Sequence, residues 1–343
     1  MAPSVLILGV EGDWGLMGSY GRAFAEIGAD VSYWNFSASV AAHARFGKVG
    51  QRIAGYLPIE PWILKANREL ITTVMERKPA VVAFTGADLR AGALAQLKVA
   101  CPDTKLVLLW PDTLLNLGDP LLNCMRVVDL VGCYSQTAIA QLELLGAKQV
   151  IWTPFAMDCE LFPEQVEISP SERLAFQSDV SFIGNHRPER ERDILRLVDA
   201  GVKVKVWAAA TWPRLAKHKG RVAEYFQGGP LFGKDVAKAM RCSTLALNLI
   251  DPLNYPAANM RVFETYACSA TPLCSRCPEV ESVFPDRESA FYFDDAQLPS
   301  TALTLLKQSE LVKSVGERGR QTALAAHKYT HRAQALLRAL GLN

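Results

Sequence analysis

The sequence alternates twice between short apolar runs and segments with helical periodicity, and this alternation limits the fold more than any other feature. Continuous apolar runs that end at turn residues are typical of strands buried on both faces of a parallel sheet. In the first half these runs lie at 5–10, 31–34, 80–84, 105–110, 129–134 and 149–154. In the second half they lie at 179–184, 202–207, 243–250, 271–275 and 290–294. The pattern predicts an α/β chain in which helices cover both faces of two sheets.

A proline-bounded polar segment separates the two sets of strands. It begins after residue 154, passes Asp158 and Pro163, and ends near Ser171. We therefore expect two Rossmann-like α/β/α domains that face each other across a cleft, the first over 1–155 and the second over 165–326. A chain of 343 residues with 50% hydrophobic content is long enough for two such cores.

Composition excludes several classes of protein. A net charge of +2 gives no basic excess of the kind that nucleic-acid binding usually requires, although a nucleic acid is not excluded as a substrate. The eight cysteines are scattered, as in a reducing compartment, and Cys274-x-x-Cys277 has no second pair at zinc-site spacing. The N-terminus lacks a signal-peptide pattern, and no apolar run reaches ~18 residues. We expect a cytoplasmic protein without a membrane span.

The segment after the strand at 243–250 places a polar loop directly before a helix. Apolar residues at helical spacing predict this helix over 260–267, with Asn259 at its N-cap position. The backbone N–H groups at the helix start, around Met260 and Arg261, lie at the positive end of the helix dipole and suit a diphosphate. Glu264 lies more than a turn further on and can reach a neutral hydroxyl group. Alternatively, Arg261 and Glu264 are solvated charges on the helix surface.

A second candidate anion site follows the strand at 179–184. A glycine, a basic loop and a helix start come in that order, and Asn185, Arg187 and Arg190 are its polar residues. Alternatively, the arginines here pair with the acidic residues at 189, 191 and 193 on a solvated helix face. The mixture of signs indicates that only one arginine points at an anion.

The loop after the first strand is rich in glycine. Gly12, Gly15 and Gly18 let the backbone come close to a ligand, or they simply form a strand-to-helix turn. Their spacing is not the Gly-x-Gly-x-x-Gly of dinucleotide-binding proteins, which disfavours a NAD-dependent oxidoreductase. The segment 208–233 contains Trp, Gly and Lys, and we expect it to be an irregular connection.

Two aspartates follow strands of the first half. Asp88 comes after the strand at 80–84, and Asp112 after the strand at 105–110. Ligands of parallel sheets bind beyond the carboxyl ends of the strands, so either carboxylate is a candidate base or hydrogen-bond partner for a substrate hydroxyl. A carboxylate that caps the next helix would look the same in the sequence.

Several of these motifs occur together in one known family. The order Asn-x-Arg-x-Phe-Glu, a small-residue break, a short apolar strand and an acidic stretch resembles the nucleotide-sugar half of CgeB-like proteins of the glycosyl transferases group 1 family. That family is similar to the retaining glycosyltransferases of GT-B fold. The resemblance covers about residues 150–335, and more faintly the first half. The matching segments lie at 110–112, 154–162, 182–190, 259–284 and 327–332.

The resemblance implies a function and roles for the candidate residues. It implies a glycosyltransferase, retaining and independent of metals and cofactors, that moves a sugar from a nucleotide-diphosphate-sugar donor to a hydroxyl or other nucleophile of an unidentified acceptor. Arg190 and the helix start at 259–261 would hold the diphosphate, and Glu264 the ribose. The loop with Gly12 and Gly15 would face the donor phosphates. The first domain, joined by a C-terminal helix at about 327–343, would bind the acceptor, with Asp112 ahead of Asp88 as the catalytic residue.

The sequence departs from the family in two places. Pro256 stands where the first acid of a Glu-x7-Glu pair would contact the sugar, which leaves the stereochemistry and the sugar open. The helix at 260–267 ends in Cys-Ser-Ala where the family has Ala-x-Gly. Two alternative functions also fit the architecture: a nucleotide-sugar epimerase and a non-catalytic nucleotide-sugar binding protein.

Overall fold

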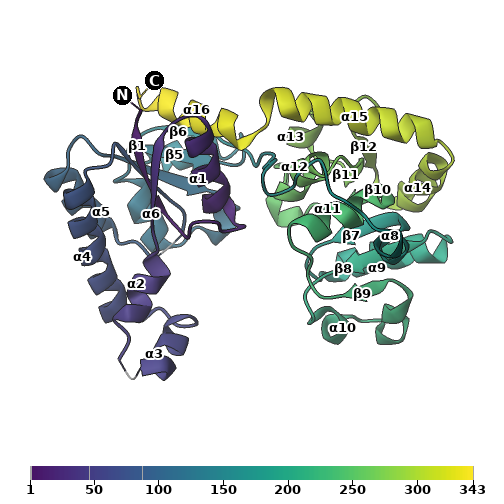
Figure 1. Cartoon of the computed structure of the whole chain (residues 1–343), viewed down its shortest axis with the longest axis horizontal. Coiled ribbons are helices and arrows are strands. Elements are labelled where there is room, and N and C mark those ends of the chain that lie inside the picture. Colours follow the sequence, from purple (N-terminus) through teal and green to yellow (C-terminus); the bar gives the residue numbers. More distant parts are fainter. Residues whose placement is uncertain (1, 46, 87, 343) are drawn as a thin grey trace. The chain divides into compact units, whose positions relative to one another are not determined.

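The structure is a computed structural model, and it describes residues 2–45, 47–86 and 88–342. The chain divides into two compact units, each built around one six-stranded parallel sheet (Figure 1). Unit 1 comprises Met1–Pro154 and Tyr329–Asn343, and unit 2 comprises Phe155–Lys328. Within the described residues, none of the helices combines the length and apolar character that crossing a membrane requires.

Unit 1 has the strand order β2-β1-β3-β4-β5-β6. Its strands are β1 (Ser4–Leu8), β2 (Asp30–Trp34), β3 (Val81–Phe84), β4 (Lys105–Trp110), β5 (Leu130–Cys133) and β6 (Val150–Trp152). Its helices are α1 (Leu16–Glu26), α2 (Phe36–Ala42), α3 (Gly47–Ala54), α4 (Glu60–Arg77), α5 (Ala91–Ala100), η1 (Leu114–Asn116), α6 (Asp119–Met125), α7 (Ile139–Leu144) and α16 (Tyr329–Ala339). The strands β3 and β5 are buried along their whole length, as their continuous apolar sequences require.

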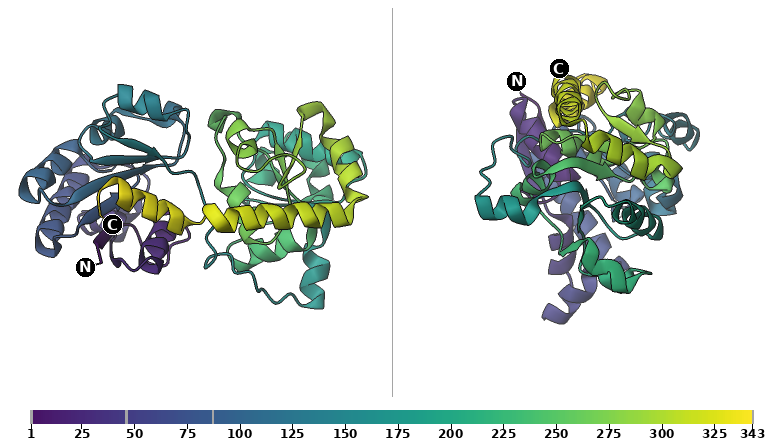
Figure 2. Two further views of the ribbon diagram at one scale, coloured as in Figure 1. Left: turned by 90° about the horizontal axis from the view of Figure 1, so that it is seen from above. Right: turned by 90° about the vertical axis from the view of Figure 1, so that its right-hand side faces the viewer.

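The last helix, α16, packs on the first one, α1, although most of the chain separates them (Figure 2). The ring of Tyr329 contacts the ring of Tyr20 edge-on, with 5.2 Å between the centroids. Arg332 is buried and donates a hydrogen bond from Nε to the carbonyl of Pro154 (3.0 Å). Unit 1 is therefore discontinuous in sequence, and the chain passes into unit 2 and back again.

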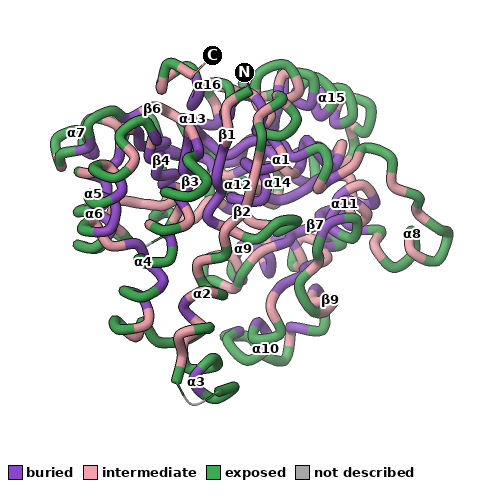
Figure 3. Tube along the Cα trace, turned by 60° about the vertical axis from the view of Figure 1, so that its left-hand side comes forward, coloured by how far each residue is buried: buried purple, intermediate pink, exposed green. Residues whose placement is uncertain are grey.

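Unit 2 has the strand order β12-β11-β10-β7-β8-β9. The chain adds β8 and β9 on one side of β7 and then β10, β11 and β12 on its other side, so the strand order reverses between β7 and β10. Its strands are β7 (Ser178–Ile183), β8 (Val204–Trp207), β9 (Phe226–Gly228), β10 (Ser243–Asn248), β11 (Pro272–Ser275) and β12 (Phe291–Phe293). Its helices are α8 (Pro170–Phe176), α9 (Pro188–Asp199), α10 (Trp212–Leu215), η2 (Lys219–Glu224), α11 (Lys234–Arg241), η3 (Pro252–Asn254), α12 (Met260–Ala267), α13 (Pro278–Glu281), η4 (Asp295–Gln297), α14 (Leu298–Leu306) and α15 (Ser309–Ala326). In both units the central strands form the buried interior, and most of the exposed surface lies on the helices and loops (Figure 3).

The segment 208–233 is more ordered than the sequence predicted. The expectation of an irregular connection was wrong, because this segment holds α10, η2 and the edge strand β9, which pairs with β8. Trp212 and Tyr225 are fully buried there, and the indole Nε1 of Trp212 donates a hydrogen bond to the hydroxyl of Tyr225 (3.3 Å). Two large buried side chains fix the segment against the sheet.

Candidate functional site

Unit 2 has a cavity at the carboxyl ends of β7, β10, β11 and β12. Its volume is about 440 Å³, and it lies beside the point where the strand order reverses. Ligands of open α/β sheets bind at this kind of position, because the loops that leave neighbouring strands in opposite directions open a crevice there. The charged residues of its lining include Arg187, Arg190, Arg192, Asp251, Arg276 and Asp295.

Arg190 spans the ends of the two strands at the reversal. Its guanidinium donates to the carbonyl of Asn185 after β7 (3.0 Å) and to the carbonyl of Leu249 after β10 (3.3 Å). The guanidinium carbon also lies 5.9 Å from the centroid of the Phe182 ring. Burial lowers the pKa of Arg190, but a guanidinium keeps its charge in proteins. Among the described residues no carboxylate lies within ion-pair distance of Arg190, so its positive charge is fixed at the crevice without a direct ion pair.

The arginines beside Arg190 are compensated by carboxylates. Arg187 is exposed and pairs through Nε with Asp251 (3.1 Å). Arg276 pairs with three carboxylates, those of Glu281 (2.7 Å), Asp294 (3.2 Å) and Asp286 (3.3 Å). These contacts leave Arg190 as the cation best suited to an anionic ligand in this cavity.

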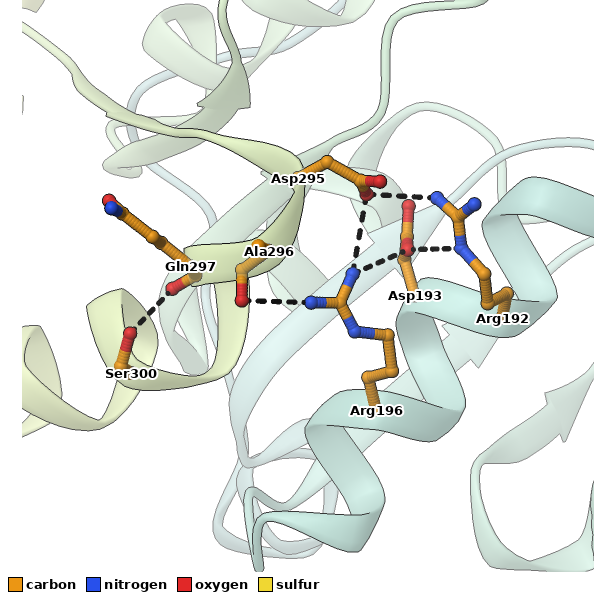
Figure 4. Close-up of polar contacts among 7 residues, drawn as sticks. All are labelled: Arg192, Asp193, Arg196, Asp295, Ala296, Gln297 and Ser300. Atoms are coloured by element: carbon orange, nitrogen blue, oxygen red, sulfur yellow. Dashed lines mark hydrogen bonds and ion pairs between the residues drawn. The ribbon is translucent and has the colours of Figure 1, made fainter.

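Arg192 and Arg196 belong to a network that ties α9 to η4 (Figure 4). Arg192 donates to Asp193 (3.0 Å) and Asp295 (2.9 Å), and Arg196 donates to the same two carboxylates and to the carbonyl of Ala296 (2.9 Å). The alternative hypothesis, in which arginines of this basic segment pair with neighbouring acids, therefore holds for Arg192. One of its partners, Asp295, lies about a hundred residues away in sequence and could not be identified from local spacing.

The start of α12 and Arg190 both contact the end of β10. Asn259 occupies the N-cap position, but its side chain does not cap the helix and instead donates from Nδ2 to Oδ1 of Asn248 (2.9 Å). The Oδ1 atom of Asn259 is buried and has no hydrogen-bond partner in the part of the chain that the structure describes. Asn248 directly precedes Leu249, whose carbonyl holds Arg190. The structure thus brings the two candidate anion sites of the second domain to one strand end.

Arg261 and Glu264 contact each other. Nη1 of Arg261 pairs with Oε2 of Glu264 across one helical turn, and their side chains are only 22% and 14% exposed. They are therefore not the solvated surface charges of the alternative hypothesis. Met260, at the first helical position, has an exposed side chain.

A buried glutamate that the sequence analysis missed fixes the basic loop to the segment after α10. Glu191 is 1% exposed and accepts hydrogen bonds from Nε2 of His186 (2.9 Å) and from the backbone N–H groups of Lys217 (2.9 Å) and His218 (2.8 Å). Burial alone would raise the pKa of Glu191, but these hydrogen bonds outweigh burial and hold the pKa at about 2. The sequence signal was helical spacing, because Ile194 and Leu195 follow Glu191 by three and four residues and share its buried face of α9.

Unit 1 has its own cavity, of about 310 Å³, at the carboxyl ends of β1, β2 and β3. Asp88 and Asp13 border it. Asp112, at the end of β4, uses both carboxylate oxygens locally, accepting from the N–H of Thr113 (2.7 Å) and from the side-chain amide of Asn116 (2.8 Å). Each of these oxygens keeps a second lone pair, so both aspartates stay candidate bases, and of the two only Asp88 is in the lining of this cavity.

The two candidate glycines flank Asp13. Gly12 has a φ of 73°, a conformation that few other residues adopt, and Gly15 is the N-cap residue of α1 without a side chain to cap it. The N–H groups of the first turn of α1 are therefore not covered by a cap at this position. Among the described residues, no three His, Cys, Asp or Glu side chains are placed together to hold a metal ion.

Comparisons with known proteins agree with this architecture. Residues 187–338 match a family model described as glycosyl transferase-like, which covers fewer than half of the residues. No curated protein matches the sequence significantly. Sucrose-phosphate synthase from Thermosynechococcus elongatus has a similar structure, with a TM-score of 0.70 at 14% sequence identity over 99% of each chain.

Two further structures are similar. HepE from Anabaena, in complex with UDP and glucose, has a TM-score of 0.65 at 15% identity over 99% of each chain. The α,α-trehalose 6-phosphate synthase from Burkholderia multivorans has a TM-score of 0.65 at 11% identity, over 100% of this chain and 99% of the other. The predicted fold, two Rossmann-like domains of the GT-B type, is confirmed by these matches. The predicted class, a glycosyltransferase, is confirmed by the family match. The narrower resemblance to CgeB-like proteins stays a prediction.

Proposed function

We propose that this glycosyltransferase takes its sugar from a nucleotide-diphosphate-sugar held in the cavity of unit 2. The observation that carries the proposal is Arg190, a half-buried cation without a carboxylate partner among the described residues, fixed between the ends of β7 and β10. A diphosphate placed there would accept hydrogen bonds from the guanidinium and from the uncapped N–H groups at the start of α12. The same groups would stabilise the charge that develops on the leaving diphosphate.

Other donor contacts follow from this placement. The buried Oδ1 of Asn259 can accept a hydrogen bond from a donor hydroxyl, and Asn185 and Arg187 extend the polar edge around Arg190. Glu264, held by Arg261, would accept from the ribose hydroxyls. UDP-sugars are the first donors to test, because similar proteins were solved with UDP and glucose and with UDP-2-fluoro glucose.

Unit 1 would supply the acceptor side. Its cavity offers Asp88 and Asp13 to an acceptor hydroxyl, while Gly12 and Gly15 let the α1 end of the loop approach a phosphate. Asp88 is exposed and borders this cavity, so it is the preferred hydrogen-bond partner or base. An acceptor hydroxyl is the simplest substrate for such a carboxylate.

Retention and independence of metals are part of the same proposal. Position 256 is a proline, so no carboxylate at this position contacts the sugar. Its carbonyl accepts hydrogen bonds from the Glu279 N–H (3.2 Å) and from the Cys277 thiol. Retention would then depend on the leaving diphosphate rather than on a Glu-x7-Glu pair. The anomeric configuration of the first product, read by NMR, and the rate in the presence of a chelator test these two points.

The experiment that tests the donor site is calorimetry with UDP, other nucleoside diphosphates and their sugars. The wild type should bind one nucleoside diphosphate selectively, and Arg190→Ala should weaken that binding by about 10- to 100-fold, since hydrogen bonds to charged groups contribute about 1.5–3 kcal/mol. Glu264→Ala should weaken binding of the whole nucleotide but not of inorganic pyrophosphate, because Glu264 is assigned to the ribose.

The matched control is Arg173→Ala. Arg173 is an exposed arginine in the last turn of α8, beside the residues that begin β7 and β10 at the other end of these strands, and its loss should leave binding unchanged. The proposal would be wrong if no nucleotide bound, or if Arg190→Ala bound as tightly as the control. Consumption of the donor without any acceptor, with an isomerised sugar nucleotide as product, would instead indicate the epimerase.

A further inference from the structure

Large apolar side chains of unit 1 face solvent on α3 and the turn that follows it. Val49 is 66% exposed, Ile53 39%, Tyr56 80% and Leu57 57%. The N–H groups of Tyr56 and Leu57 both donate to the carbonyl of Ile53 (2.9 Å), so the helical path continues past the end of α3. At this spacing the four side chains share one face, which we call the α3 surface.

The face of α3 beside the α3 surface is made of small residues. Gly50 is buried, and a Cβ atom there would lie 1.7 Å from the carbonyl oxygen of Arg45. Ala54 packs against a small cluster that contains Val40 and Ile63. The small residues therefore face the protein and the large apolar residues face outward, which is the reverse of a helix that stabilises its own domain. In Figure 1 α3 lies at the end of unit 1 away from α16, and in Figure 3 it is coloured mostly as exposed.

The residues around the α3 surface are positively charged. Arg45, Lys48 and Arg52 are exposed, and the sequence contains no acidic residue between Asp30 and Glu60. Across the described parts of the chain, no carboxylate lies within ion-pair distance of these three cations. Glu60 itself is compensated, because Arg90 donates to both of its carboxylate oxygens (2.6 and 3.0 Å). On the helix, Lys48 and Arg52 flank the apolar face.

We propose that the α3 surface binds an anionic lipid membrane. An apolar stripe with Tyr and Leu, bordered by Lys and Arg, is the composition of helices that lie in the interface of a bilayer. The apolar side chains would enter the boundary between headgroups and acyl chains, and the cations would contact anionic headgroups, each contributing about fivefold in affinity. A second copy of this chain would bring the same cations together. A protein partner would need its own matching acidic surface. The proposal goes beyond sugar transfer and does not depend on the donor site.

The test is flotation of the full-length protein with vesicles. Wild-type protein should float with vesicles made of equal parts phosphatidylglycerol and phosphatidylcholine, should not float with phosphatidylcholine alone, and should be released by high salt. Val49→Asp/Tyr56→Asp should lose flotation by at least about tenfold, and Lys48→Glu/Arg52→Glu should lose it comparably. Circular dichroism and the melting temperature show whether each variant folds.

The matched control is Val99→Asp/Leu144→Asp. Val99 on α5 and Leu144 on α7 are 85% and 88% exposed in the same unit, so this variant has the same change in charge and also removes two large exposed apolar side chains. It should float with the anionic vesicles nearly as well as the wild type. The proposal would be overturned if the wild type did not float, or if the control and the α3 variants floated equally. A wild-type dimer that Val49→Asp/Tyr56→Asp converts to a monomer, without any flotation, would assign the surface to self-association instead.

Discussion

At the scale of the residue, Glu191 makes the stability of unit 2 depend on pH in a defined window. Its pKa is lowered from 4.5 to about 2, because hydrogen bonds from His186, Lys217 and His218 to the ionised carboxylate outweigh burial. The unfolded chain therefore binds this proton at a higher pH than the folded chain does. The stabilisation is complete above pH 4.5, and it is lost as the pH falls towards about 2.

Replacing Glu191 by Gln should show this directly. Urea unfolding should give a free energy of unfolding about 1–3 kcal/mol below the wild type at pH 7, because two backbone N–H groups lose an ionised acceptor. Between pH 4.5 and pH 3 the free energy should fall less steeply than in the wild type. The neighbouring Glu189→Gln, at an exposed position, should keep the wild-type profile. Equal slopes for Glu191→Gln and the wild type would contradict the assignment.

At the scale of the element, Gly18 fixes the glycine-rich loop to α1. A Cβ atom at Gly18 would lie 2.0 Å from the carbonyl oxygen of Asp13, the same oxygen that accepts a hydrogen bond from Arg22 (3.0 Å). Gly18→Ala must displace this backbone, so we expect a loss of about 1–3 kcal/mol in the free energy of unfolding. Gly92→Ala is the control, since a Cβ atom at that helical position meets open space and Ala favours a helix. If both variants unfold at the same urea concentration, the loop is not held by this contact.

Elements whose apolar pattern is continuous could be predicted from the sequence, whereas those defined by distant partners could not. The helix expected at 260–267 is α12, because Asn259 before it and small residues after it mark both ends. The strand β9 has only three residues, Phe226–Gly228, and no apolar run, so only its pairing with β8 reveals it.

The same distinction holds for the candidate site. Arg190 could be proposed because a glycine and a helix start surround it in sequence. Its freedom from carboxylates could not, because it depends on Asp251 and Asp295 pairing with other arginines after folding. Asn248 was hidden at the end of an apolar strand, and Asp112 ranked ahead of Asp88 in the sequence although only Asp88 is in the lining of the unit 1 cavity, a position that depends on folding.

At the scale of the whole molecule, the discontinuity of unit 1 means that its stability depends on the last helix. Six residues of α16 are buried in unit 1: Tyr329, Thr330, Arg332, Ala333, Leu336 and Leu337. Each large apolar side chain among them contributes about 1.5–3 kcal/mol on burial, so their sum is comparable with the ~5–15 kcal/mol that stabilises a typical domain. Unit 2, in contrast, is continuous from Phe155 to Lys328 and contains its own core.

A chain that ends at Lys328 should therefore lose unit 1 and keep unit 2. In calorimetry we expect the transition of unit 1 to disappear or fall by more than about 10 °C, since a 1 kcal/mol loss lowers the melting temperature of a domain of this size by about 2–4 °C. The transition of unit 2 should remain near its wild-type position and rise when the nucleoside diphosphate that binds the wild type is added. Tyr329→Ala, which removes only the ring that contacts Tyr20, should shift the same transition by a smaller amount. If the truncated chain lost both transitions together, the two units would fold as one cooperative body, and the donor site would depend on a helix that lies outside its own unit.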